Sequence, residues 1–161
     1  MNTRESKVFS IDDGPNVGKC MISPDDRFVA AASGNTVRIW DVATGVLVDC
    51  LRGHDAMVWS VAFTHDGKGL VSCSENSMLK YWEFSTALRD THETGGQFSK
   101  CIQDFTGHRG DVNYAAISHD GQWIVSSSAD CGVQFWDRHG RTHLMLQGHH
   151  DSGTRISLPV F

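Results

Sequence analysis

The 161-residue sequence has few of the features that mark membrane insertion, phosphate binding or nucleic-acid binding. Only three residues are proline, and no apolar run approaches the roughly 20 residues that a bilayer-spanning helix needs. Lysine and arginine number 14 against 19 aspartates and glutamates and form no cluster, which argues against direct nucleic-acid binding. A Gly-rich phosphate loop and a calcium-loop pattern are also missing. We therefore expect a globular domain that acts without a membrane, a cofactor or a nucleic acid.

The cysteines and histidines form no recognisable metal or disulfide framework. The five cysteines are an odd number, and none belongs to a Cys-x-x-Cys pair. Cys20, Cys73 and Cys101 lie in apolar stretches, where a free thiol packs as a small hydrophobic group. Four of the nine histidines lie near the C-terminus: His139, His143, His149 and His150. Because they have no zinc spacing with cysteine, we predict no metal site, and we expect reduced cysteines in a nuclear or cytosolic protein.

A repeat organises most of the chain. Three short patterns recur in one order: Gly-His at residues 53–54 and 107–108, Asp-Gly at 66–67 and 120–121, and Trp followed by an acid at 82–83 and 136–137. His54 precedes Trp82 by 28 residues, and His108 precedes Trp136 by the same distance. An earlier copy ends at Trp40 and is one residue shorter at the turn of residues 33–35. Such self-similarity at a fixed period is typical of repeat architectures.

Each copy is predicted to form short strands joined by turns. In the second and third copies the expected strands are residues 58–63, 70–73, 79–83, 112–117, 123–126 and 133–137. A further strand is expected before each Gly-His, at residues 47–51, 101–105 and 143–146. Together with three strands of the first copy, the total is twelve strands in three four-stranded units, with no helical pattern between them. An insertion of about a dozen residues within 85–100 is predicted to be an exposed loop, because it is polar and holds Gly95 and Gly96.

Gly-His, a core strand, Asp-Gly, a Ser-rich strand and Trp-Asp in this order resemble the WD40 repeat. The resemblance implies an all-β fold, a β-propeller of four-stranded blades around a channel. We expect a partial propeller with an incomplete ring. Its blades would span about residues 8–51, 52–105 and 106–147, with the start of a further blade at 148. The repeat region of 8–150 would lie between an N-terminal tail at 1–7 and a non-repeat tail at 151–161.

A narrower resemblance covers roughly residues 8–152. The sequence Ser-Ile-Asp-Asp-Gly at 10–14 stands where the first Gly-His is expected, residues 132–137 are followed by Leu-Met-Leu-Gln-Gly-His at 144–149, and the insertion follows Trp82. These features resemble the later blades of the fungal Tup-type general transcriptional corepressors, relatives of the Groucho proteins. The resemblance implies a nuclear, non-catalytic propeller that docks onto DNA-bound repressors and works with other corepressor subunits.

Three alternatives remain beside the corepressor interpretation. A WD40 scaffold in another complex, for example in ubiquitin-ligase substrate reception, would show the same repeats. Because the family's propeller has more blades than the three visible here, the chain is also expected to be a truncated gene product or a partial gene model, and a nonfunctional one is an alternative. Blades with open edges predict self-association or dependence on a partner. The third alternative to the corepressor interpretation is an enzyme that uses the histidines.

His108, Asp130 and a serine within residues 126–128 have the residue types of a hydrolytic triad. A triad also needs an oxyanion site, and the sequence has no nucleophile elbow, so we predict no enzymatic activity. The WD40 resemblance implies instead a buried network in which an imidazole bridges a turn carboxylate and a hydroxyl, while an indole N–H donates. The expected members are His54, Trp82, His108, Asp130 and Trp136. Asn76 replaces the acid in the second copy, and Asp13 replaces the histidine in the first.

The family pattern places partner-binding positions three and five residues after the Gly-His histidine and just before the turn acid. Carried over, these positions are Met57, Trp59 and Glu75 in the second copy and Asp111, Asn113 and Ala129 in the third. Methionine and aromatic side chains suit protein interfaces. The alternative for Trp59 is packing across a blade interface. The insertion after Trp82 is a second candidate contact surface, with a solvated loop as its alternative.

Overall fold

The computed structural model describes residues 17–84 and 98–147, which form twelve strands in three antiparallel sheets. The first sheet holds β1 (Val17–Ile22), β2 (Phe28–Ser33), β3 (Thr36–Asp41) and β4 (Leu47–Arg52). The second holds β5 (Val58–Phe63), β6 (Gly69–Ser74), β7 (Met78–Phe84) and β8 (Ser99–Thr106). The third holds β9 (Val112–Ile117), β10 (Trp123–Ser128), β11 (Gly132–Asp137) and β12 (Thr142–Gln147).

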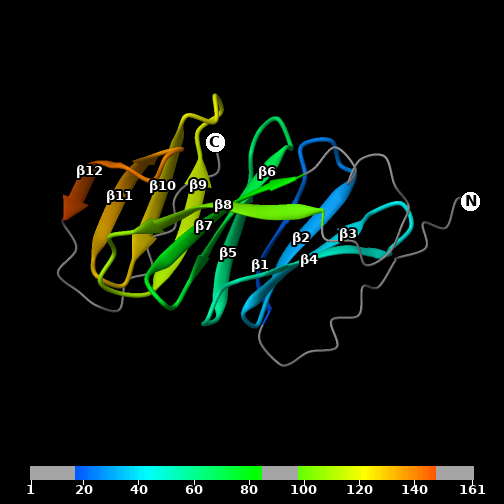
Figure 1. Cartoon of the computed structure of the whole chain (residues 1–161), viewed down its shortest axis with the longest axis horizontal. Helices are drawn as coiled ribbons and strands as arrows, with labels where there is room; N and C mark the ends of the chain where they lie inside the picture. Colours follow the sequence, from blue (N-terminus) through cyan, green and yellow to red (C-terminus); the bar gives the residue numbers. More distant parts are fainter. Residues whose placement is uncertain (1–16, 85–97, 148–161) are drawn as a thin grey trace, which may run out of the picture.

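The three sheets follow one another as consecutive blades of a partial propeller, with the second sheet between the other two and no closed ring (Figure 1). Within each blade, the strands pair in chain order. The all-β fold with three four-stranded blades is therefore confirmed. Among the described residues, no helix is long and apolar enough to span a membrane.

The first hairpin turn of each blade is held by the same side-chain bonds. In the second blade, the Thr64 hydroxyl donates to Asp66 Oδ1 at 2.7 Å and accepts from the Gly69 N–H at 2.9 Å. Ser118 with Asp120 repeats this arrangement in the third blade, and Ser23 with Asp25 repeats it in the first. The turns of the second and third blades also contain a glycine at positive φ, which explains the recurring Asp-Gly.

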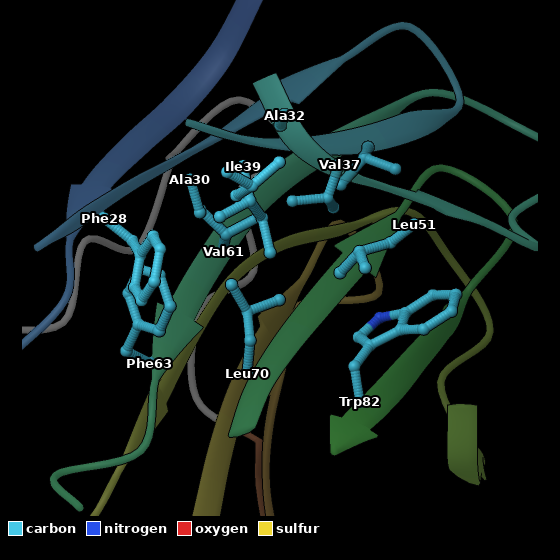
Figure 2. Packing of buried hydrophobic residues seen from close by; sticks show 12 residues of the cluster. Phe28, Ala30, Ala32, Val37, Ile39, Leu51, Val61, Phe63, Leu70 and Trp82 are labelled. Atoms are coloured by element: carbon cyan, nitrogen blue, oxygen red, sulfur yellow. The ribbon is translucent and has the colours of Figure 1, made fainter. Parts of the chain in front are cut away.

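Neighbouring blades bury the faces that they turn toward each other. We call the face toward the preceding blade the front face and the face toward the following blade the back face. The back face of the first blade packs against the front face of the second through one set of residues: Ala30, Ala32, Val37, Ile39 and Leu51 with Val58, Val61, Phe63, Leu70 and Trp82 (Figure 2). The back face of the second blade packs on the front face of the third through an equivalent set: Val71, Cys73, Leu79, Tyr81 and Phe105 with Val112, Ala115, Ile124 and Trp136.

Two sequence predictions need correction. The loop predicted over residues 85–100 is wrong at its C-terminal end, because Ser99 and Lys100 belong to β8 and pair with Phe84 and Glu83 of β7. Cys73 is buried as expected, but Cys20 is exposed, since the front face of the first blade meets no other described sheet. The predicted tails, residues 85–97 of the insertion, the blade start at 148, and His149 and His150 lie outside the described residues.

Candidate functional site

The third blade contains a hydrogen-bonded network of four side chains. His108 Nδ1 lies 2.9 Å from Asp130 Oδ2, and His108 Nε2 lies 2.8 Å from Ser126 Oγ. The Trp136 indole N–H donates to the same serine oxygen at 2.8 Å. Asp130 also accepts the Arg109 and Gly132 backbone N–H groups, both at 2.9 Å. Burial opposes ionisation, but these donors and the adjacent imidazole hold the pKa of Asp130 below its usual value.

The buried position of this network favours a structural role over hydrolysis. The Ser126 side chain is completely inaccessible to solvent, and its hydroxyl is engaged with both His108 and Trp136. With the Nδ1 proton donated to Asp130, His108 Nε2 accepts the serine proton and Ser126 accepts the indole proton. The four groups therefore connect the segment before β9 to β10, β11 and the turn between them.

The second blade has the same network without its acid. His54 Nε2 lies 2.7 Å from Ser72 Oγ, which accepts the Trp82 indole N–H at 2.8 Å. Asn76 occupies the position of Asp130, and both His54 Nδ1 and Asn76 Oδ1 are buried without a hydrogen-bond partner. Burial, followed by the nearby Lys80 cation, lowers the pKa of His54 to about 4. A buried imidazole with one unsatisfied nitrogen is a weak point of the second blade.

The first blade lacks the serine as well. Ala31 pairs with Arg38 in the same register in which Ser72 pairs with Lys80 and Ser126 with Gln134. Ala31 therefore stands at the serine position, and Asp13, which replaces the histidine, lies outside the described residues. The network is thus complete in the third blade, reduced in the second and without its serine in the first.

The predicted partner-binding residues gather at one end of the second and third blades. Met57 directly precedes β5 and Glu75 directly follows β6, and the Glu75 N–H donates to the Met57 carbonyl at 2.9 Å. The equivalent pair in the third blade has the same bond, from the Ala129 N–H to the Asp111 carbonyl at 2.8 Å. In each of these two blades, one acidic and one apolar side chain therefore stand on neighbouring positions, Glu75 with Met57 and Asp111 with Ala129. Asp111 is exposed, whereas Met57 and Glu75 are half-buried.

Trp59 and Asn113 are the second residues of β5 and β9, and both are half-buried. The indole N–H of Trp59 is shielded from solvent and has no hydrogen-bond partner. The neighbouring β1 strand comes very close to the Trp59 backbone, because a Cβ added to Gly18 would lie 2.6 Å from the Trp59 carbonyl oxygen. Trp59 thus lies where the first and second blades meet, and part of its side chain remains accessible.

One contact between distant blades was not predicted from the sequence. Lys19 of β1 donates to the Tyr114 hydroxyl of β9 at 2.9 Å, and its ammonium lies 4.1 Å from the centre of the tyrosine ring. This bond reaches past β5 and ties the first blade to the third. Among the described residues, no group of three or more His, Cys, Asp or Glu side chains could hold a metal ion.

A model of the family described as "WD domain, G-beta repeat" matches residues 5–41, 45–83 and 99–137. The chain therefore belongs to the WD40 family. The solved structure "Crystal structure of RRP9 WD40 repeats" has the same fold, with a TM-score of 0.71 and 24% identity over 84% of this chain and 39% of that one. WD40 repeats imply a protein-interaction scaffold, and propellers of this family are typically non-catalytic.

The names of the curated relatives describe different roles. The chain is 56% identical over 54 residues to "Transcriptional repressor rco-1" of Neurospora crassa, covering 33% of the chain and 9% of that protein. It is 28% identical over 145 residues to "Nuclear distribution protein PAC1-2" of Uncinocarpus reesii, covering 84% of the chain and 32% of the relative. It is 28% identical over 109 residues to "Target of rapamycin complex subunit LST8" of Saccharomyces cerevisiae, covering 68% and 32%. The resemblance to Tup-type corepressors is confirmed, and the chain spans about a third or less of these relatives' length.

Proposed function

We propose that the chain is a propeller segment of a nuclear transcriptional corepressor and that it docks onto DNA-bound repressors. The observation that carries this proposal is the 56% identity to a transcriptional repressor over 54 residues, twice the 28% found with the longer matches. The WD40 fold supports a role in binding other proteins.

The proposed docking surface is the blade end that carries Met57, Trp59, Glu75, Asp111 and Asn113. It combines a half-buried methionine and tryptophan with the carboxylates of Glu75 and Asp111. Aromatic and methionine side chains provide most of the buried apolar area at such interfaces, while acidic groups at the rim select basic partners. We therefore expect a partner segment with an apolar anchor flanked by lysine or arginine.

The test is affinity capture of partners from nuclear extract on the immobilised chain, followed by mass spectrometry. The matched variants are Trp59→Ala, which removes the proposed anchor, and Ile102→Ala, which truncates an exposed apolar residue on β8, away from this surface. We expect DNA-binding transcription factors to bind the unaltered chain and the Ile102→Ala variant but not the Trp59→Ala variant. Equal capture by all three proteins would refute the proposed surface.

A second candidate function is a scaffold role in a different complex. The matches to PAC1-2 and LST8 favour it, since they cover 84% and 68% of the chain. The same capture experiment separates the two functions. If the proteins lost with Trp59→Ala belong to a complex without DNA-binding factors, the surface is correct and the corepressor role is wrong.

A further inference from the structure

A cavity of about 130 Å³ lies where the first strands of the three blades meet. β1 packs on β5 and β5 packs on β9, and residues from all three strands border the cavity. Its lining extends from Lys19 and Tyr114, in the middle of β1 and β9, to the hairpin turns that follow β5 and β9. Met57 of the proposed docking surface precedes β5, so the cavity opens at the opposite end of that strand.

The first strands are the innermost strands of the partial propeller. Neighbouring first strands pack along their length, whereas the fourth strands β4 and β8 approach each other only at a few residues. Propeller blades surround a channel, so the innermost strands form its wall. Additional blades of a propeller pack on blade faces and leave this wall open to the channel. The cavity is therefore a feature of the channel wall and does not depend on what covers the outer blade faces.

The middle of the cavity carries a cation. The Lys19 ammonium has three N–H groups, of which the Tyr114 hydroxyl accepts one at 2.9 Å. The ring of Tyr114 lies beneath the same ammonium, at 4.1 Å from its centre. Among the described residues, no aspartate or glutamate lines the cavity. The half-buried ammonium thus keeps N–H donors for a further, negatively charged acceptor.

Two histidines border the cavity at the hairpin turns. His65 and His119 occupy the same position in the turns of the second and third blades, and their ring centres are 3.8 Å apart. Both are exposed, and even a neutral imidazole has one N–H donor. The next residue of each turn, Asp66 and Asp120, accepts the hydroxyl and backbone N–H bonds that hold the turn together. These two carboxylates are therefore engaged within their own turns.

The rest of the lining is largely apolar and includes Met21, Ala62 and Ile117. A group that fills the cavity must offer methylenes to these side chains and a negative charge to Lys19. A glutamate side chain has both parts, whereas a free inorganic anion has no apolar part. The small volume of the cavity admits one such side chain.

We propose that this cavity binds a glutamate side chain from an acidic segment of a partner protein, which enters the channel at the hairpin-turn end. Lys19 pairs with the carboxylate, His65 and His119 donate N–H groups to it, and the apolar lining covers the methylenes. Tyr114 holds the Lys19 ammonium in position. This site is separate from the docking surface around Trp59. The two ends of the channel thus bind segments of opposite charge.

The test is an NMR titration of the purified full chain, labelled with ¹⁵N, with the peptide acetyl-Gly-Gly-Glu-Gly-Gly-amide. We expect saturable shifts of the backbone amide resonances of Lys19, His65, Tyr114 and His119. The matched peptide with glutamine in place of glutamate keeps the size and loses the charge. It should bind at least about tenfold more weakly, because a charge-assisted hydrogen bond is lost.

The matched protein variants are Lys19→Met and Lys68→Met. Lys19→Met removes the cation of the cavity and should weaken binding of the glutamate peptide by about tenfold or more. Lys68→Met removes a cation from the nearby turn of the second blade, outside the cavity lining, and should bind as the unaltered chain does. Tyr114→Phe loses the bond to Lys19 but keeps the ammonium, so it should retain most of the affinity. The dispersion of each ¹⁵N spectrum checks that the blades are folded.

Four outcomes would overturn the proposal. They are the absence of saturable shifts with the glutamate peptide, equal binding of the glutamine peptide, and equal binding by folded Lys19→Met and Lys68→Met. The fourth is displacement of the peptide by inorganic phosphate at concentrations below those at which the peptide itself binds. In that case the cavity selects a free oxyanion and not an acidic segment. None of these results bears on the capture of partners through Trp59.

Discussion

Mild acid is expected to weaken the protein through His54. The imidazole is only 3% exposed, and burial together with the nearby Lys80 lowers its pKa to about 4. In the unfolded chain, histidine titrates near its ordinary value of about 6.5. Between about pH 6.5 and pH 4, the imidazole binds a proton in the unfolded state but stays neutral in the folded state, so protonation favours unfolding. The contribution of neutral His54 to the free energy of unfolding is therefore fully present above about pH 6.5 and is lost as the pH decreases toward about 4.

The size of the effect follows from the two pKa values. Each pH unit within this window changes the free energy of unfolding by about 1.4 kcal/mol, so acidification to pH 5 should remove about 2 kcal/mol. This is a large share of the stability of a small domain, which is on the order of 5 to 15 kcal/mol. The carboxylates with lowered pKa values, including Asp130 and Asp41, remain charged at pH 5 and contribute little there.

The assay is urea denaturation at several pH values between 7 and 5, for the unaltered chain and for His54→Gln. Of these two proteins, only the unaltered chain should lose the additional free energy of unfolding, about 2 kcal/mol at pH 5. A third protein, Asn76→Asp, places a carboxylate where Asp130 stands in the third blade, and the turn has the same backbone because Ser77 and Cys131 have φ values of 64° and 63°. The new acceptor should raise the pKa of His54 and reduce the acid sensitivity. Identical pH dependence in all three proteins would refute this reasoning.

Three further predictions concern the third blade and the cysteines. Ser126→Ala leaves His108 and Trp136 without their shared partner and should lower the free energy of unfolding by about 3 kcal/mol in urea titrations, whereas no change would show that the network contributes nothing. Cys131→Gly relieves a left-handed backbone at φ 63° and should raise the thermal midpoint through a gain of up to about 1 kcal/mol; a lower midpoint would mean that the side chain itself stabilises the turn. Burial raises the pKa of Cys73 to about 12, so a thiol reagent at pH 8 should label it only after unfolding, and rapid labelling of the native chain would contradict its burial.

The sequence predicted the blades because each depends on local patterns. The alternation in residues 58–63 and the fixed distance from Gly-His to Trp-Asp define a strand set without knowledge of the rest of the chain. The positions around His108, Asp130 and Trp136 follow from the same register, so a resemblance was enough to locate them.

Contacts between blades were harder to predict. The bond from Lys19 to Tyr114 joins residues that are 95 positions apart. Nothing in the sequence of either repeat indicates that β1 and β9, the first strands of the first and third blades, come close enough for this contact. The exposure of Cys20 was missed for the same reason, since an apolar stretch does not reveal whether a neighbouring blade covers it. The missing partner of His54 Nδ1 follows from Asn76 in the sequence, but its burial does not.

Every strand ladder described here joins strands that are adjacent in the chain. Each blade can therefore assemble from contacts of short sequence separation, which form early and quickly during folding. As the chain leaves the ribosome, the first blade would complete its hydrogen bonds before the second has emerged. The second blade differs, because the segment between Phe84 and Ser99 makes closure of its outer strand β8 entropically more expensive than the short turns elsewhere. We expect β8 to be the last strand of its blade to dock. The second blade would therefore finish folding after the first and third blades have begun to fold.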